Sequence, residues 1–84
     1  MQKTLISKEY RFFLSHLRAA RKGRGLSQVQ VARRLRETQS FVSKCERGER
    51  RLDVVELRTW CEALGVPFVA FLRKFDRSLR TRRA

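Results

Sequence analysis

Hydrophobic positions recur at helical spacing in five segments of this chain, and no segment shows the alternating pattern of a strand. In the first segment, Ser7 can cap a helix that ends near Lys22, before Gly23, and whose apolar stripe consists of Tyr10, Phe13, Leu14 and Leu17. In the last segment, Pro67 suits the first turn of a helix, and the stripe consists of Phe68, Phe71, Leu72, Phe75 and Leu79. The pattern predicts an all-α fold.

Two short helices are predicted between Leu26 and Arg51. Ser27 can cap the first while Gln30 reaches back to the Ser27 amide, which satisfies two N–H groups that a helix start leaves unpaired. Thr38 can cap the second, and Gly48 supplies a left-handed stop after Arg47. The inward positions of the pair are Val31, Ala32, Leu35, Val42 and Cys45. Two helices joined by so tight a turn indicate a helix-turn-helix.

The second of these helices has a distinctive outward face, made of Gln39, Ser40, Ser43, Lys44 and Arg47. Amide, hydroxyl and cationic groups hydrogen-bond base edges and phosphates, whereas an ordinary solvated face carries more glutamate. The face therefore predicts a helix that reads DNA. Phe41 has two interpretations: its ring touches a thymine methyl group in the groove, or it packs on the scaffold.

A further helix is predicted after Asp53, which forms a second capping box with Glu56. Its apolar positions are Val54, Leu57, Trp60, Cys61 and Leu64. Gly65 ends this helix. Trp60 shares a face with Leu57 and Leu64, so it is interpreted as a core residue.

The chain resembles the Xre family of bacterial and phage regulators, which are lambda-repressor-like helix-turn-helix proteins. The resemblance spans Leu14 to Leu72, and the phrase QSFVSKCERGERRLD looks like one common bacterial branch of the family. The residues that match the family pattern are Arg21, Leu26, Ser27, Gln28, Ala32, Leu35, Ser40, Val42, Glu46 and Gly48. The resemblance implies a compact five-helix DNA-binding domain whose helix over residues 39–47 enters the major groove.

The same resemblance assigns roles to individual residues. Base contacts fall to Gln39, Ser40 and Lys44, and contacts to the DNA backbone to Gln28, Ser43, Arg47, Arg50 and Arg51. Gln28 also steadies Gln39, whereas Arg21 and Glu46 form a structural salt bridge. The alternative for each single arginine is that it only solvates a loop.

Arg36 departs from the family, because many relatives have glycine in this turn, and glycine tolerates a positive φ. The arginine either accepts the strain of that conformation or uses a different turn. An alternative role for its side chain is contact with a phosphate.

Composition narrows the class of partner. The 21 Lys and Arg residues against 8 acidic ones give a formal net charge of +13 in 84 residues, and such a field attracts polyanions. No segment approaches the ~20 apolar residues of a membrane-spanning helix, and the N-terminal stretch lacks a signal-peptide core. These features predict a cytoplasmic protein whose partner is double-stranded DNA rather than a membrane.

The titratable residues do not indicate catalysis or a cofactor. Cys45 and Cys61 lie on apolar helix faces and are expected to remain thiols in the core. His16 is the only histidine, so neither a zinc site nor a nucleophile–base arrangement is supported. We expect no enzyme activity, no metal and no cofactor.

The predicted organisation is an N-terminal arm over 1–7, a helix-turn-helix domain over 8–76 and a basic C-terminal tail over 77–84. Residues 80–84 of this tail are expected to be frayed and solvated. Because the last stripe exceeds what a small core needs, Phe71, Phe75 and Leu79 are expected to form a dimer interface. The predicted function is a dimeric repressor on a pseudo-palindromic operator. The alternatives are an antitoxin that binds a toxin and its own promoter, and a binder of RNA or unstructured polyanions.

Overall fold

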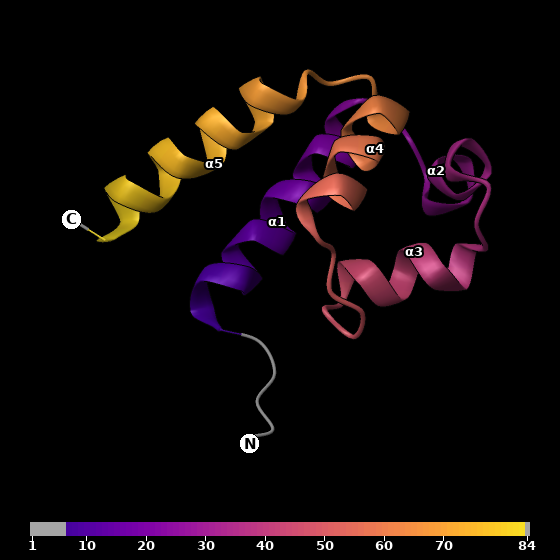
Figure 1. The fold of residues 1–84 in the computed structure, drawn as a ribbon, viewed down its shortest axis with the longest axis horizontal. Helices are drawn as coiled ribbons and strands as arrows, with labels where there is room; N and C mark the ends of the chain where they lie inside the picture. Colours follow the sequence, from indigo (N-terminus) through magenta and orange to yellow (C-terminus); the bar gives the residue numbers. More distant parts are fainter. Residues whose placement is uncertain (1–6, 84) are drawn as a thin grey trace.

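The computed structural model describes residues 7–83, which form five α-helices and no strand (Figure 1). The helices are α1 (Lys8–Gly23), α2 (Gln28–Leu35), α3 (Gln39–Glu46), α4 (Val54–Leu64) and α5 (Phe68–Arg83). Each helix begins directly after the residue that the sequence indicates as its start. The predicted all-α fold is therefore confirmed. Most of the predicted arm, residues 1–6, lies outside the described residues.

Side chains close the N-terminal ends of the first four helices. Ser7 accepts from the Tyr10 amide at 3.0 Å and Thr38 from the Phe41 amide at 3.0 Å. Ser27 and Asp53 each form a complete capping box with the residue three positions later. These bonds explain why helices as short as α2 and α3 begin at defined residues, since an uncapped start leaves several N–H groups unpaired.

The core lies where α1 and α4 pack against the α2–α3 pair. Its most deeply buried apolar residues are Leu17, Val31, Val42, Cys45, Cys61, Trp60 and Leu64. The expected core position of Trp60 is confirmed, because the residue is 1% exposed. Val54 is an exception to the predicted stripe: it is 63% exposed because it is the first residue of α4, which enters the core only from Leu57 onward.

α5 lies against α1 rather than leaving an open apolar stripe. Phe71 is 8% exposed and its ring meets Phe13 edge-on, with centroids 6.1 Å apart. Phe75 is half-buried, and its ring lies 5.8 Å from Phe13 and 6.1 Å from Phe12. The role of Phe71 in a dimer interface stays a prediction, although α1 covers most of its surface.

The basic end of the chain also differs from the expected frayed tail, because α5 continues to Arg83. Arg82 lies 4.8 Å from the centroid of the Phe12 ring, and Arg80 pairs with Asp76 one turn earlier at 3.1 Å. Arginine is a good helix former. These contacts, together with the helix propensity of arginine, allow α5 to continue through the residues that were expected to fray.

In the turn between α2 and α3, Arg36 takes the strained left-handed conformation, which is one of the two alternatives left open by its sequence. Arg36 adopts φ +59° and ψ +41° as the C-cap of α2. The amide of Glu37 donates to the Ala32 carbonyl at 2.9 Å, which closes the turn. A side chain in this region costs ~1 kcal/mol relative to the ordinary helical conformation.

We expect Arg36→Gly to stabilise the domain by up to ~1 kcal/mol, because glycine adopts positive φ without strain. Thermal unfolding followed by circular dichroism measures the change as a rise in Tm. Arg33→Gly is the matched control, since it removes the same charge from the interior of α2 and is expected to lower Tm. A Tm for Arg36→Gly at or below that of the wild type would contradict the strain.

Candidate DNA interface

α3 presents to solvent the polar face that its sequence predicts. Gln39, Ser40 and Lys44 are exposed, and Ser43 is partly exposed. Val42 and Cys45, on the opposite side of the same helix, are fully buried. Because the buried side fixes the rotation of α3, the three predicted base-reading side chains face outward together.

A buried ion pair between Glu46 and Arg21 joins α3 to α1. The Glu46 carboxylate is 2% exposed and accepts from Arg21 Nε at 2.7 Å and from Arg21 Nη2 at 3.1 Å. Arg21 Nη1 donates to the Leu26 carbonyl at 2.9 Å. All three guanidinium nitrogens therefore have acceptors, and the pair ties the end of α3 to α1 and to the start of the helix-turn-helix.

Glu46 also connects to the outward face of α3 through Gln28. Gln28 Nε2 donates to Glu46 Oε1 at 2.9 Å, and Gln39 Nε2 donates to Gln28 Oε1 at 2.7 Å. A carboxylate only accepts hydrogen bonds, so it determines which end of the Gln28 amide faces it. Gln28 therefore directs its Oε1 toward Gln39. After this hydrogen bond, Gln39 still has one side-chain N–H and its Oε1 available for a base.

The link between Glu46 and Gln28 was not foreseen from the sequence, although contact between Gln28 and Gln39 was expected. The sequence spacing of Gln28 and Glu46 does not indicate this hydrogen bond, because the two side chains meet only through the angle at which α2 packs against α3. The consequence is a hydrogen-bonded series from the buried ion pair to the first residue of α3.

The arginines that follow α3 all have partners within the chain. Arg47 pairs with Glu49 at 2.8 Å and donates to the Ser43 hydroxyl. Arg50 forms two hydrogen bonds with the Glu56 carboxylate, at 2.8 and 3.0 Å. These hydrogen bonds lower the pKa of both carboxyl groups, Glu49 and Glu56, so both are ionised at neutral pH.

Aromatic rings support two of these cations. The Arg50 guanidinium lies 5.2 Å from the centroid of Phe41, and the Arg51 guanidinium lies 4.2 Å from that of Tyr10. Arg47 and Arg50 are about half exposed. Exposed ion pairs are worth little in water, so both guanidinium groups can exchange a carboxylate for another anion at small cost.

Phe41 packs on the scaffold, which is one of the two interpretations left open. Its ring is tilted against Trp60 with centroids 6.2 Å apart, and the residue is partly buried. Arg50 covers it as well. The ring therefore links α3 to α4.

Both cysteines are free and buried, as expected, and burial raises the pKa of each thiol to about 11. His16 lies among aromatic rings, 4.9 Å from Phe12, and its burial together with the charge of Lys74 lowers its pKa. Within residues 7–83, no three His, Cys, Asp or Glu side chains are grouped as metal ligands. No helix in the same range has the length and apolarity to cross a bilayer.

Comparisons with known proteins agree with this geometry. The helix-turn-helix family model matches residues 17–71. An XRE-family like protein from Pseudomonas syringae pv. tomato str. DC3000 is 41% identical over 83% of this chain and 85% of its own, with a TM-score of 0.78. The clp gene regulator ClgR from C. glutamicum has the same fold, at 24% identity, a TM-score of 0.73 and coverage of 86% and 94%.

No curated protein sequence matches the chain. The family match covers more than half of the chain and includes the whole of the α2–α3 pair. The chain therefore belongs to the Xre family of lambda-repressor-like helix-turn-helix proteins and is a DNA-binding transcriptional regulator rather than an enzyme.

Proposed function

We propose that this regulator is a dimeric repressor that reads a pseudo-palindromic operator with α3 in the major groove. The observation that carries the proposal is the exposed face of α3, on which Gln39 is oriented by Gln28 and Glu46. An oriented amide spends little conformational entropy on binding. The fixed orientation of the Gln39 side chain therefore favours a role in recognising a base.

The free groups of Gln39 suit adenine. Its carbonyl oxygen can accept from adenine N6, and its remaining N–H can donate to N7, which is the bidentate pairing that glutamine makes in the major groove. Ser40 and Lys44, exposed on the same face, contact neighbouring base edges. These three residues supply sequence preference.

Affinity comes from a second set, made of Gln28, Ser43, Arg47, Arg50 and Arg51. Gln28 lies at the start of α2, where helix N–H groups favour a phosphate. The arginines exchange their carboxylate and ring partners for phosphates. The net charge of +13 favours this exchange.

The small number of base contacts that one chain can make favours binding as a dimer. Three side chains discriminate modestly, whereas a twofold pair doubles them on half-sites about one helical turn apart. With Phe71 in the core, the exposed parts of Phe75 and Leu79 remain as the proposed interface. The antitoxin alternative would use the same surface for an unrelated protein.

Selection of bound duplexes from a random pool at physiological salt tests the proposal. We expect an enriched motif with two inverted half-sites, and sedimentation of the protein with that duplex should give two chains per site. Enrichment of no motif would contradict sequence-specific recognition. One chain per duplex, with a single half-site, would contradict the dimer.

We expect Arg50→Ala to weaken binding to all duplexes by a similar factor and to make binding less sensitive to salt. Loss of one phosphate contact reduces the slope of log K against log salt by ~0.9. Fluorescence anisotropy at several salt concentrations measures both effects. Arg73→Ala, which removes an exposed cation from α5, is the control and should leave most of the slope intact. Equal slopes for Arg50→Ala and the wild type would exclude Arg50 from the phosphate contacts.

A further inference from the structure

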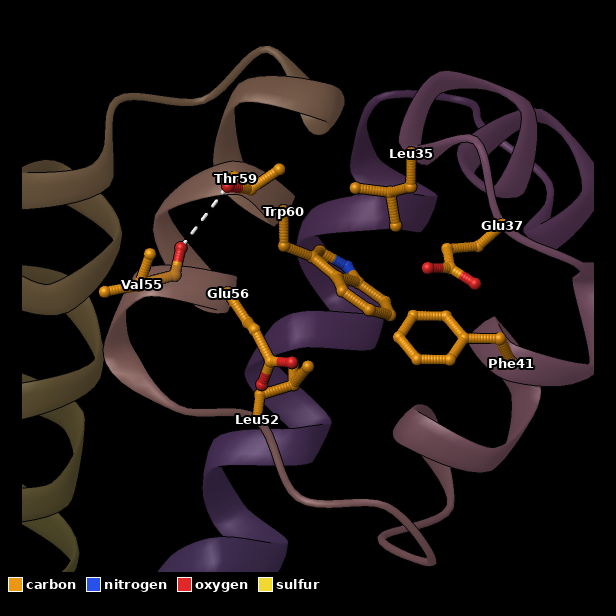
Figure 2. A pocket seen from close by; sticks show the side chains of 8 residues that line it. All are labelled: Leu35, Glu37, Phe41, Leu52, Val55, Glu56, Thr59 and Trp60. Carbon is orange, nitrogen blue, oxygen red and sulfur yellow. Dashed lines mark hydrogen bonds between the residues drawn. The ribbon is translucent and has the colours of Figure 1, made fainter.

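The two flanks of α3 differ in their chemistry. Toward α4, an apolar pocket beside Trp60 has two acidic residues in its wall, Glu37 and Glu56 (Figure 2). Toward α1, a groove of about 340 Å³ is lined by three arginines and two other residues: Arg11, Arg18, Arg47, Leu14 and Glu46. An anion that lies beside α3 is therefore attracted to the flank that faces α1.

The carboxylate in the wall of this groove does not neutralise its arginines. Glu46 is 2% exposed, and its two oxygens already accept hydrogen bonds from Arg21 and Gln28. Neither Arg11 nor Arg18 forms an ion pair within residues 7–83. The groove therefore keeps a positive charge, and an anion that enters it breaks no ion pair of these two residues.

Arg18 is fixed in place by the end of α3. Its Nη1 donates to the Glu46 carbonyl at 2.9 Å, which is one of the carbonyls that a helix end leaves without a partner in the helix. The residue is partly buried, and its Nε and Nη2 make no hydrogen bond to another of the described residues. A guanidinium group that is held at one nitrogen presents its remaining N–H groups in a fixed plane, which suits the oxygens of a phosphate.

Arg11 and Arg47 approach the same groove from different helices. Arg11 lies two turns before Arg18 on the same face of α1, and Leu14 lies between them, 3% exposed. Arg47 follows the last residue of α3, and its side chain is about half exposed. Cations from α1 and α3 therefore converge at the end of the face that is proposed to read bases.

We propose that this groove binds a phosphate of the DNA backbone, which Arg11 and Arg18 of α1 hold together with Arg47. The proposal rests on the proposed function, because it requires α3 to enter the major groove. The phosphates of both strands border that groove, and contacts to them fix the position of a protein on the duplex. Gln28 contacts a phosphate near the start of α3 in the proposed function, so α1 adds a contact near the end of the same helix.

The salt dependence of binding to a duplex of mixed sequence tests this site, because every sequence carries phosphates. In fluorescence anisotropy, the double variant Arg11→Ala/Arg18→Ala should bind about tenfold more weakly than the wild type. Its slope of log K against log salt should be smaller by ~0.9, which corresponds to one phosphate that is no longer neutralised. Arg11→Ala alone should lower both quantities in part and keep the wild-type Tm, because Arg11 is exposed and has no ion pair to lose.

Arg24→Ala is the matched control. Arg24 directly follows α1, but it lies in a different groove, between α1 and α5, with its guanidinium group beside Gly65. This variant should keep most of the wild-type slope. The proposal is overturned if the double variant has the slope of the wild type, or if Arg24→Ala loses as much slope as the double variant. The second result would mean that net charge alone determines the effect.

The selection of duplexes from a random pool separates this proposal from the proposed function. A smaller slope for the double variant, with no enriched motif in the selection, would support the phosphate site and contradict sequence-specific reading by α3. An enriched motif, with equal slopes for the double variant and the wild type, would overturn the phosphate site alone.

Discussion

Glu46→Ala is expected to lower the free energy of unfolding by ~3 kcal/mol, because it leaves the Arg21 guanidinium buried without its counter-charge. Two of the three guanidinium nitrogens lose their acceptor, and Gln28 Nε2 loses one as well. Arg21 is 8% exposed, so water does not replace these bonds freely. In a domain of this size, the loss corresponds to a fall in Tm of roughly 12–24 °C.

Chemical denaturation and thermal unfolding, both followed by Trp60 fluorescence, measure this change. Glu49→Ala is the control, because Glu49 also pairs with an arginine but at an exposed position, with its side chain 55% accessible. The control is expected to unfold near the wild-type temperature. Similar Tm values for Glu46→Ala and the wild type would show that the ion pair does not hold α3 to α1.

Gln39→Ala is expected to remove the preference for adenine at one position of each half-site, at a cost of ~1–3 kcal/mol per bidentate contact. The alanine variant should bind a duplex with another base at that position about as well as the selected one. Because the exposed side chain of Gln39 hydrogen-bonds only Gln28 within the described residues, its removal should leave the Tm almost unchanged. The loss is therefore one of recognition and not of folding.

A duplex with 7-deazaadenine at the selected position isolates this contact, since it lacks only the N7 acceptor. The wild-type protein should lose affinity for the modified duplex, whereas Gln39→Ala should bind modified and unmodified duplexes equally. The same modification at a flanking adenine outside the half-sites is the control and should affect neither protein. Equal losses in both proteins would mean that another residue reads this base.

Local chemistry allowed most of the fold to be predicted. Each start of the first four helices depends on a side chain and an amide three residues apart, as at Ser27 and Gln30, and such bonds need no knowledge of tertiary structure. The positive φ at Arg36 is one of the alternatives left open by the glycine that many relatives have there, and the structure adopts it. Helical spacing likewise identified Trp60 and Val42 as core residues.

Features that depend on packing between helices were not predictable in this way. The stripe of α5 does not reveal that α1 covers Phe71, or that Phe12 provides a ring on which Arg82 lies. The contacts of Gln28 with Glu46 and of Arg50 with Glu56 depend on angles between elements. The pocket beside Trp60 has the same origin, because its wall comes from three helices and two turns.

The most direct test of DNA recognition by α3 is a ¹H–¹⁵N titration of the protein with the selected duplex at physiological salt. We expect the largest shifts at the amides of residues 39–47 and at the side-chain amides of Gln28 and Gln39, with smaller ones at Arg50 and Arg51. Shifts confined to α5 and the C-terminal arginines, with the amides of α3 unchanged, would contradict recognition of DNA by α3.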